Sequence, residues 1–313
     1  MKIVLTGGCG FIGSHLTDAL LDDGAKLLVI DNHSCAGPPY HRKEAEYLIE
    51  DIVSEKAAIK IGEFSPDVVI HLAAQMDVRY SVAHPEVDAR INIEGTVNML
   101  ESARKVGCRR FIFASSGGAI YGDTEPMPAG EEHSIEPESA YGTSKRCGEL
   151  YLRYFGKLYG MKNLALRLAN VYGPRQSSKG EAGVVAIFAA RMIEGKQAII
   201  FGDGSQTRDY VYVTDVRNAF LTAVRRPEIT GEINIGTSIE TSVNRLYELM
   251  KELYGYDKPP KYAPAREGEQ LRSVLLYDKA TRLLDWQPSF SLTVGLQKTL
   301  DWAKVNYEQY LKS

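Results

Sequence analysis

The sequence of 313 residues has few of the features that mark secreted or metal-binding proteins. It contains only four cysteines, without a Cys-x-x-Cys pair, and six histidines, none of which is paired at i, i+4. This spacing predicts neither a disulfide framework nor a metal site, so we interpret the histidines as structural and expect a reducing compartment. The cysteines are Cys9, Cys35, Cys108 and Cys147, and the histidines are at positions 15, 33, 41, 71, 84 and 133.

The net charge and the lengths of the apolar runs exclude further classes of function. The net charge of −3 and the pI of about 6.1 give no basic surface for nucleic acid or anionic lipid. No apolar run approaches the roughly 18 residues of a membrane span, and the N-terminal apolar stretch is too short for a secretory signal. We therefore expect a soluble, cytoplasmic protein that acts on small molecules, with neither nucleic acid nor membrane as a partner.

A glycine-rich turn near the N-terminus organises the rest of the chain. Residues 2–6 predict a strand, Gly7, Gly10 and Gly13 follow, and residues 11–21 show helical apolar spacing. The free amides and the positive end of a helix dipole meet at such a turn, which favours a pyrophosphate. A second predicted strand ends at Asp31, where a dinucleotide fold places the carboxylate that binds the adenosine ribose. Because this carboxylate would repel a 2′-phosphate, the sequence predicts NAD and not NADP.

The pattern after Asp31 predicts an α/β fold with a doubly wound parallel Rossmann sheet. Strands are expected near 45–49, 67–72, 110–115 and 164–168, and helices near 52–62, 85–106 and 141–159. We assign 1–169 plus 213–236 to an NAD-binding domain, and 170–212 plus 237–313 to a smaller C-terminal α+β substrate lobe. Residues 237–313 read as helices and loops, and ligands are expected at the carboxyl edge of the sheet.

Tyr141 and Lys145 are the candidate chemical groups. At i and i+4 they project from the same face of the predicted helix. Lowering a Tyr pKa from about 10 to about 7 requires about 4 kcal/mol of preference for the phenolate. A neighbouring Lys and a bound nicotinamide cation can supply it by charge attraction. The same spacing is common on helix surfaces, but behind a dinucleotide turn it predicts that Tyr141 is a general base.

Together these motifs resemble those of extended short-chain dehydrogenases/reductases over nearly the whole chain, and most of all UDP-glucose 4-epimerases. The matching stretches are Thr-Gly-Gly-Cys-Gly-Phe-Ile-Gly, Asp31-Asn32, Asp51-Ile52, His-Leu-Ala-Ala-Gln, Asn92, Ser-Ser-Gly-Gly-Ala-Ile-Tyr-Gly, Tyr141/Lys145, Asn-Val-Tyr-Gly-Pro-Arg and Gly-Asp-Gly-Ser-Gln-Thr-Arg-Asp-Tyr-Val. The resemblance implies inversion of carbon 4 of a UDP-hexose through a transient 4-keto sugar. Tyr141 would act as base and then acid, while tightly held NAD takes and returns the hydride and Lys145 holds the nicotinamide ribose.

One departure from the family concerns the hydroxyl that assists the tyrosine. The family usually has Ser or Thr four residues before the Tyr121-Gly122 pair, and this chain has Gly117 there. We expect Ser116 to replace it as the third catalytic residue, with Ser115 or a water as alternatives.

The resemblance also assigns the contacts of both ligands. NAD contacts are expected from Gly7, Gly10, Phe11, Ile12, Gly13, Asp31, Asn32, Asp51, Ile52, Leu72, Ala73, Ala74, Gln75, Asn92, Ser115, Tyr141, Lys145 and Leu168. Substrate contacts are expected from Ser116, Tyr141, Asn170, Gly183, Val184, Phe201, Arg208, Arg266, Glu269 and Ser273.

Several substrate contacts have a stated role. Gly183, Val184 and Phe201 would face the uridine, and Glu269 its ribose. Arg208 and Arg266 would bind the diphosphate through their forked donors, although Arg266 is as readily a solvated surface residue. Ser273 stands where some epimerases carry a bulky Tyr, so its small size predicts that N-acetylated sugars are accepted.

Three further interpretations remain open. The predicted helices 85–106 and 141–159 resemble the pair that forms a four-helix dimer interface, which predicts a homodimer unless they only cover the sheet. A UDP-glucuronate 4-epimerase or decarboxylase is the nearest alternative function, and a dehydratase is disfavoured because its Thr-Asp-Glu is replaced by residues 117–119, Gly-Gly-Ala. A non-catalytic NAD sensor would be favoured by loss of Tyr141 or Lys145, and both are present.

Overall fold

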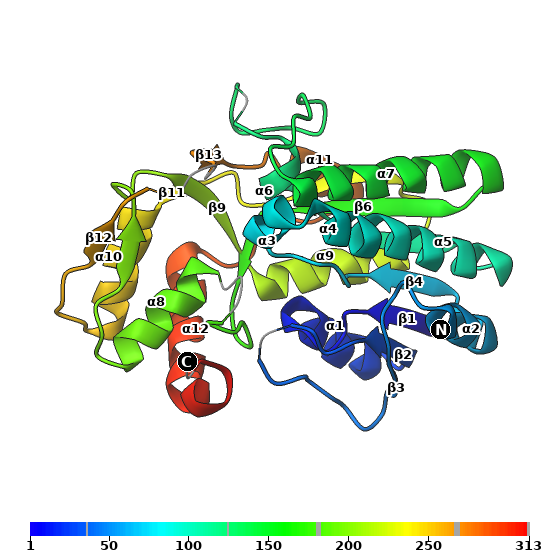
Figure 1. The fold of residues 1–313 in the computed structure, drawn as a ribbon, viewed down its shortest axis with the longest axis horizontal. Coiled ribbons are helices and arrows are strands. Elements are labelled where there is room, and N and C mark those ends of the chain that lie inside the picture. Colours follow the sequence, from blue (N-terminus) through cyan, green and yellow to red (C-terminus); the bar gives the residue numbers. More distant parts are fainter. Residues whose placement is uncertain (36, 124, 180–182, 266–269, 312–313) are drawn as a thin grey trace.

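A computed structural model describes residues 1–313 except 36, 124, 180–182, 266–269 and 312–313. Its centre is a seven-stranded, wholly parallel sheet in the order β10-β6-β5-β4-β1-β2-β3 (Figure 1). The chain winds outward from β1 in one direction and then from β4 in the other, so the switch point lies between these two strands. The predicted doubly wound Rossmann sheet is confirmed.

The strands of this sheet are continuous apolar runs, as expected where both faces are covered. Successive residues alternate between two cores, with Leu5 in one and Val4 in the other. The strands are β1 (Lys2–Thr6), β2 (Lys26–Asp31), β3 (Glu46–Ile49), β4 (Val68–His71), β5 (Arg110–Ser116), β6 (Lys162–Leu168) and β10 (Gly231–Ile235).

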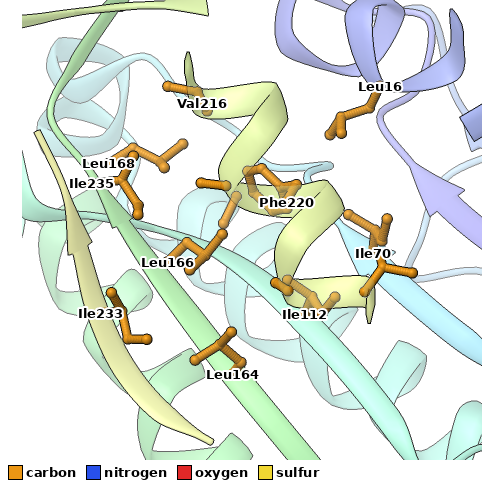
Figure 2. Close-up of a cluster of buried hydrophobic side chains, with 14 of the residues drawn as sticks. Leu16, Ile70, Ile112, Leu164, Leu166, Leu168, Val216, Phe220, Ile233 and Ile235 are labelled. Atoms are coloured by element: carbon orange, nitrogen blue, oxygen red, sulfur yellow. The ribbon is translucent and has the colours of Figure 1, made fainter. Parts of the chain in front are cut away.

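Helices on opposite faces of the sheet bury these two cores. One face is covered by α1 (Phe11–Asp22) and α9 (Val213–Arg225), and the other by α2 (Glu55–Phe64), α5 (Gly95–Lys105) and α7 (Ala140–Tyr159). Figure 2 shows Phe220 of α9 among Ile70, Ile112 and Leu166 of three neighbouring strands. Burial of each such side chain contributes about 1.5–3 kcal/mol, which fixes α9 across the sheet.

The segment predicted as one helix over 85–106 is divided. It consists of α4 (Pro85–Ala89), a π-helical turn (Arg90–Glu94) and α5, and a short helix α3 (Val78–Ala83) precedes it. A π turn is often found at functional sites, because the extra residue redirects a side chain. Here it carries the buried Asn92.

A second unit lies at the carboxyl edge of the sheet (Figure 1). Its strands are β7 (Asn170–Tyr172), β9 (Thr207–Tyr212), β11 (Glu240–Ser242) and β13 (Arg272–Ser273) in one sheet, with β8 (Ile199–Phe201) and β12 (Lys261–Ala263) as a separate pair. Its helices are α8 (Val184–Ile193), α10 (Val243–Tyr254) and α12 (Leu292–Asn306), which share a core of their own. The expectation of only helices and loops after residue 237 was wrong, because strands of two or three residues leave no periodicity.

Asp209 of β9 ties this unit to the main sheet. Its buried carboxylate accepts hydrogen bonds from the backbone amides of Thr237, just after β10, and Leu275, just after β13. The other short helical elements are α6 (Gly117–Ile120), α11 (Asp278–Leu284) and a π turn (Tyr307–Leu311). Among the described residues, no helix is both long and apolar enough to cross a membrane.

Candidate active site at the carboxyl edge of the sheet

The three glycines of the N-terminal turn have different physical requirements. Gly7 has a φ of +71°, and a β-carbon there would lie 2.8 Å from the Ala73 amide nitrogen. At Gly13 a β-carbon would lie 2.0 Å from the Gly7 carbonyl oxygen. At Gly10 the φ is −81°, and the nearest atom to an added β-carbon is the same oxygen at 3.5 Å. Gly7 and Gly13 are therefore required for folding, whereas Gly10 leaves open space before α1.

That space fits a pyrophosphate. Gly10 is the N-cap of α1 and no side chain caps the helix, so its first amides face the opening with the positive end of the dipole. The predicted contacts Phe11 and Ile12 open this helix.

The acidic residues expected near the adenosine lie together at the ends of β2 and β3. Asp31 accepts hydrogen bonds from the amides of Cys9 (2.9 Å) and His33 (2.8 Å), which fixes its carboxylate. The side-chain amide of Asn32 donates to Asp51 (3.0 Å), and Ile52 beside it is buried. These predicted NAD contacts therefore lie close together at the ends of two neighbouring strands.

Asn92 organises the exit of β4. Its Oδ1 accepts from the Gln75 amide and its Nδ2 donates to the Gln75 carbonyl, both at 2.8 Å. Its Nδ2 also donates to the buried Asp88 carboxylate, which accepts from Ser144 of α7 as well. Sequence analysis did not identify Asp88, although its i, i+4 spacing to Asn92 was a usable signal. The preceding Leu72 and Ala73 amides both donate to Thr6 Oγ1, and Ala74 links them to Gln75.

The three predicted catalytic residues meet at the start of α7. Tyr141 is the second residue of this helix, which Ser139 caps by accepting from the Gly142 amide. The Ser116 side chain, at the end of β5, lies close enough to the Tyr141 hydroxyl to favour its phenolate form. One turn further, the buried Lys145 donates to the Ala114 carbonyl (2.9 Å), with its Nζ 5.6 Å from the centre of the Tyr141 ring.

The net effect of the surrounding protein is to raise the pKa of Tyr141. Desolvation raises it to about 12, with the Asp88 charge adding to the rise and the Ser116 hydrogen bond opposing it. Burial likewise lowers the pKa of Lys145 to about 8, against the attraction of Asp88 and Glu149. That Lys145 and a bound nicotinamide cation together bring the phenol toward neutrality stays a prediction.

Ser115 and Ser116 have different partners. The Ser115 hydroxyl donates to Glu149 (2.7 Å), which forms a buried ion pair with Arg167 (2.8 Å). Its side chain is thus part of a buried network with Glu149 and Arg167. Of the hydroxyls considered from the sequence, Ser116 is the one that contacts Tyr141.

Three polar side chains lie around Gly118, the second residue after Ser116. A β-carbon added at Gly118 would lie 3.5 Å from Asn170 Oδ1, 3.6 Å from Ser273 Oγ and 4.0 Å from Ser116 Oγ. Three predicted substrate contacts from β5, β7 and β13 therefore converge on one glycine. Sequence analysis quoted this glycine without giving it a role.

The other predicted substrate contacts are distributed over the second unit. Arg208 lies in register with Ser273 on the neighbouring strand, and its Nη1 donates to the Thr207 carbonyl. Gly183 and Val184 cap and begin α8, and Phe201 ends β8. Arg266 and Glu269 lie outside the described residues. Leu168, a predicted cofactor contact, is buried at the end of β6.

The parallel sheet, the glycine turn and the Tyr141–Lys145 pair define an extended short-chain dehydrogenase/reductase. Residues 3–236 match the NAD dependent epimerase/dehydratase family, and the chain belongs to that family. It is an epimerase-family enzyme, and NAD is its cofactor.

Curated relatives match over nearly the whole chain. A putative UDP-glucose 4-epimerase of Methanocaldococcus jannaschii is 44% identical over 97% of this chain and 99% of its own length. A UDP-glucose 4-epimerase of Mycolicibacterium smegmatis is 40% identical over 96% and 98%. A UDP-glucuronic acid decarboxylase of Xenopus tropicalis is 30% identical over 98% of this chain and 73% of its own.

Solved structures of three proteins resemble this chain over nearly its whole length. The UDP-glucose 4-epimerase of Thermotoga maritima with UDP-glucose has a TM-score of 0.94 at 44% identity, covering 98% of this chain and all of that one. The Thermus thermophilus UDP-glucose 4-epimerase complex with NAD has a TM-score of 0.90 at 37% identity, covering 96% and 98%. A UDP-N-acetylglucosamine 4-epimerase of Methanobrevibacter ruminantium, in complex with UDP-N-acetylmuramic acid, has a TM-score of 0.90 at 31% identity, covering 96% and 97%.

Proposed function

We propose that this chain is a UDP-hexose 4-epimerase that interconverts UDP-glucose and UDP-galactose and keeps NAD bound through the cycle. The observation that carries the proposal is the proximity of Tyr141 to Ser116, whose hydroxyl lies with the side chains of Asn170 and Ser273 around Gly118. These residues come from both the parallel sheet and the second unit, which supports a site between them. Relatives named as UDP-glucose 4-epimerases support the substrate class.

In this reaction Tyr141 takes the proton of the sugar's 4-hydroxyl and returns it after the 4-keto sugar has turned over. Ser116 orients that hydroxyl and stabilises the phenolate by its hydrogen bond. NAD, when bound, accepts hydride from carbon 4 and gives it back on the other face. Lys145 supplies a positive charge one helical turn from the phenol.

The pKa of about 12 for Tyr141 sets how much further stabilisation the phenolate requires. Bringing this pKa to neutrality takes about five units, or about 7 kcal/mol. A nearby positive charge in a site of low dielectric is a sufficient source for an effect of this size. The proposal therefore requires a cationic nicotinamide as well as Lys145 close to the phenol.

An assay without added NAD tests the function. Untagged protein incubated with UDP-galactose should produce an equilibrium mixture with UDP-glucose, measured by chromatography. Tyr141→Phe should reduce turnover by about 10³-fold, within the usual range for a general acid–base group. Tyr151→Phe, an exposed tyrosine of the same helix, should not change it.

The outcomes of this assay separate the alternatives. Conversion that starts only after NAD is added would reject retained NAD but not the reaction. Conversion of UDP-glucuronate alone would support the alternative suggested by the decarboxylase relative. A protein that binds NAD but converts none of these sugars would be an NAD sensor.

We also propose that UDP-N-acetyl sugars are accepted, because the side chain of Ser273, which lies beside Gly118, is only a hydroxymethyl group. A UDP-N-acetylglucosamine 4-epimerase among the similar structures supports this extension. Ser273→Tyr should abolish turnover of UDP-N-acetylgalactosamine while leaving most of the turnover of UDP-galactose, and Ser273→Ala should preserve both. Wild-type protein that fails to convert the N-acetyl sugar would reject this part of the proposal.

We further propose a homodimer formed through α7. Its exposed side includes Leu150, Tyr151, Tyr154 and Leu158, each at least 39% exposed and spaced as one helical stripe. An apolar stripe of this kind favours helix-to-helix association. Light scattering should give a dimer for the wild type and a monomer for Tyr154→Glu/Leu158→Glu, whereas Val305→Glu, at another exposed apolar site, should remain dimeric.

A further inference from the structure

Three side chains with metal-binding atoms lie together beside the glycine-rich turn. They are Cys9 of the turn, and His33 and His41 of the stretch that follows β2. One ligand atom from each lies within 4.8 Å of the other two, and Cys9 Sγ lies 3.8 Å from His41 Nε2. The two imidazole rings meet edge to face, with centroids 5.1 Å apart. The cluster is separate from the Tyr141 site and has no role in the proposed reaction.

Backbone contacts hold two of these residues in position. The Asp31 carboxylate accepts hydrogen bonds from the amides of both Cys9 and His33, one on each oxygen. His33 has a φ of +56°, a left-handed conformation that is uncommon for a residue with a β-carbon. The loop therefore presents this imidazole in an unusual backbone state, fixed by a charged partner.

Contacts made by the two neighbouring residues, Tyr40 and Arg42, hold His41 in position. The Tyr40 amide donates to the Cys9 carbonyl (3.0 Å), and the Tyr40 hydroxyl donates to Asp18 of α1 (2.7 Å). Arg42 on the other side forms an ion pair with the same carboxylate (2.9 Å). These contacts fasten the stretch at both sides of His41, so the three ligands are arranged before any ion binds.

The second observation that points to a ligand is a ring nitrogen of His33 without a hydrogen-bond partner in the described part of the chain. Its Nε2 is buried and has no hydrogen-bond partner among the described residues. Buried polar atoms without a partner are rare, and each calls for a specific explanation such as an ion. Cys9 is also buried, whereas the His41 side is open to solvent and gives an ion a route in.

We propose that Cys9, His33 and His41 form a zinc site that fastens the stretch around His41 to the glycine-rich turn. Zinc bonds of about 2.3 Å to sulfur and 2.0–2.1 Å to nitrogen place tetrahedral ligand atoms about 3.3–3.6 Å apart. Closing from 4.8 Å requires shifts of about 1 Å, which side-chain rotation provides. On binding, the Cys9 thiol releases its proton to solvent, and a water takes the fourth position.

The donor set and the local charge decide the class of ion. One thiolate and two imidazoles are borderline-soft ligands, which suit zinc and disfavour magnesium and calcium. The Asp31 carboxylate, hydrogen-bonded to two of the ligand residues, adds negative charge beside the cation. The site lies on the side of the turn predicted to hold the adenosine of NAD, so the ion would act on the geometry of the loop and not on the sugar.

Metal binding to the whole, untagged chain tests the proposal. Chelator-treated protein, mixed with zinc and desalted, should retain about one ion per chain by elemental analysis. Cobalt substitution should give a thiolate-to-metal charge-transfer band. Cys9→Ala, His33→Asn and His41→Asn should each weaken zinc binding by at least about 100-fold, the upper end of the loss seen for outer-shell partners. Cys147→Ser and His84→Asn, which change the same residue types elsewhere, should leave it unchanged.

Two further readouts keep loss of metal distinct from loss of fold. NAD binding should persist in Cys9→Ala, since alanine keeps the turn compact. Tryptic cleavage after the exposed Lys43 should be slowed at least about tenfold by zinc in the wild type, and be insensitive to zinc in His41→Asn. Wild-type protein that retains no zinc, or variants that retain it as well as the wild type, would overturn the proposal.

Discussion

Alanine substitutions at Gly10 and Gly13 of the glycine turn should separate the effects on NAD binding from the effects on folding. In Gly13→Ala the new methyl group would lie 2.0 Å from the Gly7 carbonyl oxygen, a backbone atom that cannot rotate away. Such a contact is relieved only by moving the turn or α1, and we expect a loss of more than about 3 kcal/mol of unfolding free energy. In Gly10→Ala the same oxygen is 3.5 Å away, an ordinary contact, and the φ of −81° suits alanine. Because alanine is a poorer N-cap than glycine, we expect a loss of about 0.5–1.5 kcal/mol, well below that of Gly13→Ala.

The two variants should therefore differ in how they lose NAD. The Gly10→Ala methyl group occupies the space before the helix that the pyrophosphate requires. Overpacking of this kind costs about 1–3 kcal/mol, which corresponds to about 5- to 150-fold weaker affinity in a folded protein. Urea unfolding and calorimetric titration with NAD measure the two quantities separately. A folded Gly10→Ala protein with wild-type NAD affinity would refute the assignment of the pyrophosphate to this turn.

The remaining predictions concern charge and proton binding inside the molecule. Glu149→Ala should lower the unfolding free energy by about 3–5 kcal/mol, because it leaves the Arg167 guanidinium buried without its ion-pair partner. Burial lowers the pKa of His71 to about 3, so between that value and its ordinary 6.5 the unfolded chain binds the extra proton. The unfolding free energy should thus decrease as the pH is lowered, and His71 should account for about 2 kcal/mol of this loss between pH 7 and pH 5. In urea titrations, His71→Gln should lack that part of the loss. Ser116→Ala removes the hydrogen bond that lowers the Tyr141 pKa, so turnover should drop and its rise with pH should move to higher pH.

Matched variants control these measurements. Glu101→Ala breaks a partly exposed pair with Arg104 and should cost no more than about 1 kcal/mol, so an equal loss at Glu149 would contradict the role of burial. Ser116→Thr keeps the hydroxyl and should restore the pH profile that Ser116→Ala shifts.

The elements that carry a local pattern could be predicted from the sequence. The strand, glycine turn and helix of residues 2–22 follow from apolar spacing and from the conformations that only glycine permits. Asp31 followed from its distance along the chain, because a short helix between two parallel strands fixes where the second strand ends. The Tyr141–Lys145 pair followed from helical spacing together with the dinucleotide turn that precedes it in the chain.

Features that depend on packing between distant segments could not be predicted. The π turn around Asn92 shifts hydrogen bonds by one residue and leaves the apolar spacing unchanged. The rise in the Tyr141 pKa depends on desolvation by the folded site, which a local Tyr-Lys spacing does not encode. Likewise, Cys9, His33 and His41 show no metal-binding spacing in sequence, because the fold of the loop after β2 is what unites them.

The fate of the hydrogen on carbon 4 tests the central claim most directly. UDP-galactose carrying deuterium at carbon 4 can be converted by the purified protein in ordinary water, and the UDP-glucose formed can be examined by mass spectrometry and NMR. If the enzyme removes this hydrogen as hydride and returns it to the same carbon, deuterium should be retained at carbon 4 of the product. Product that has exchanged the label for solvent hydrogen would contradict the account.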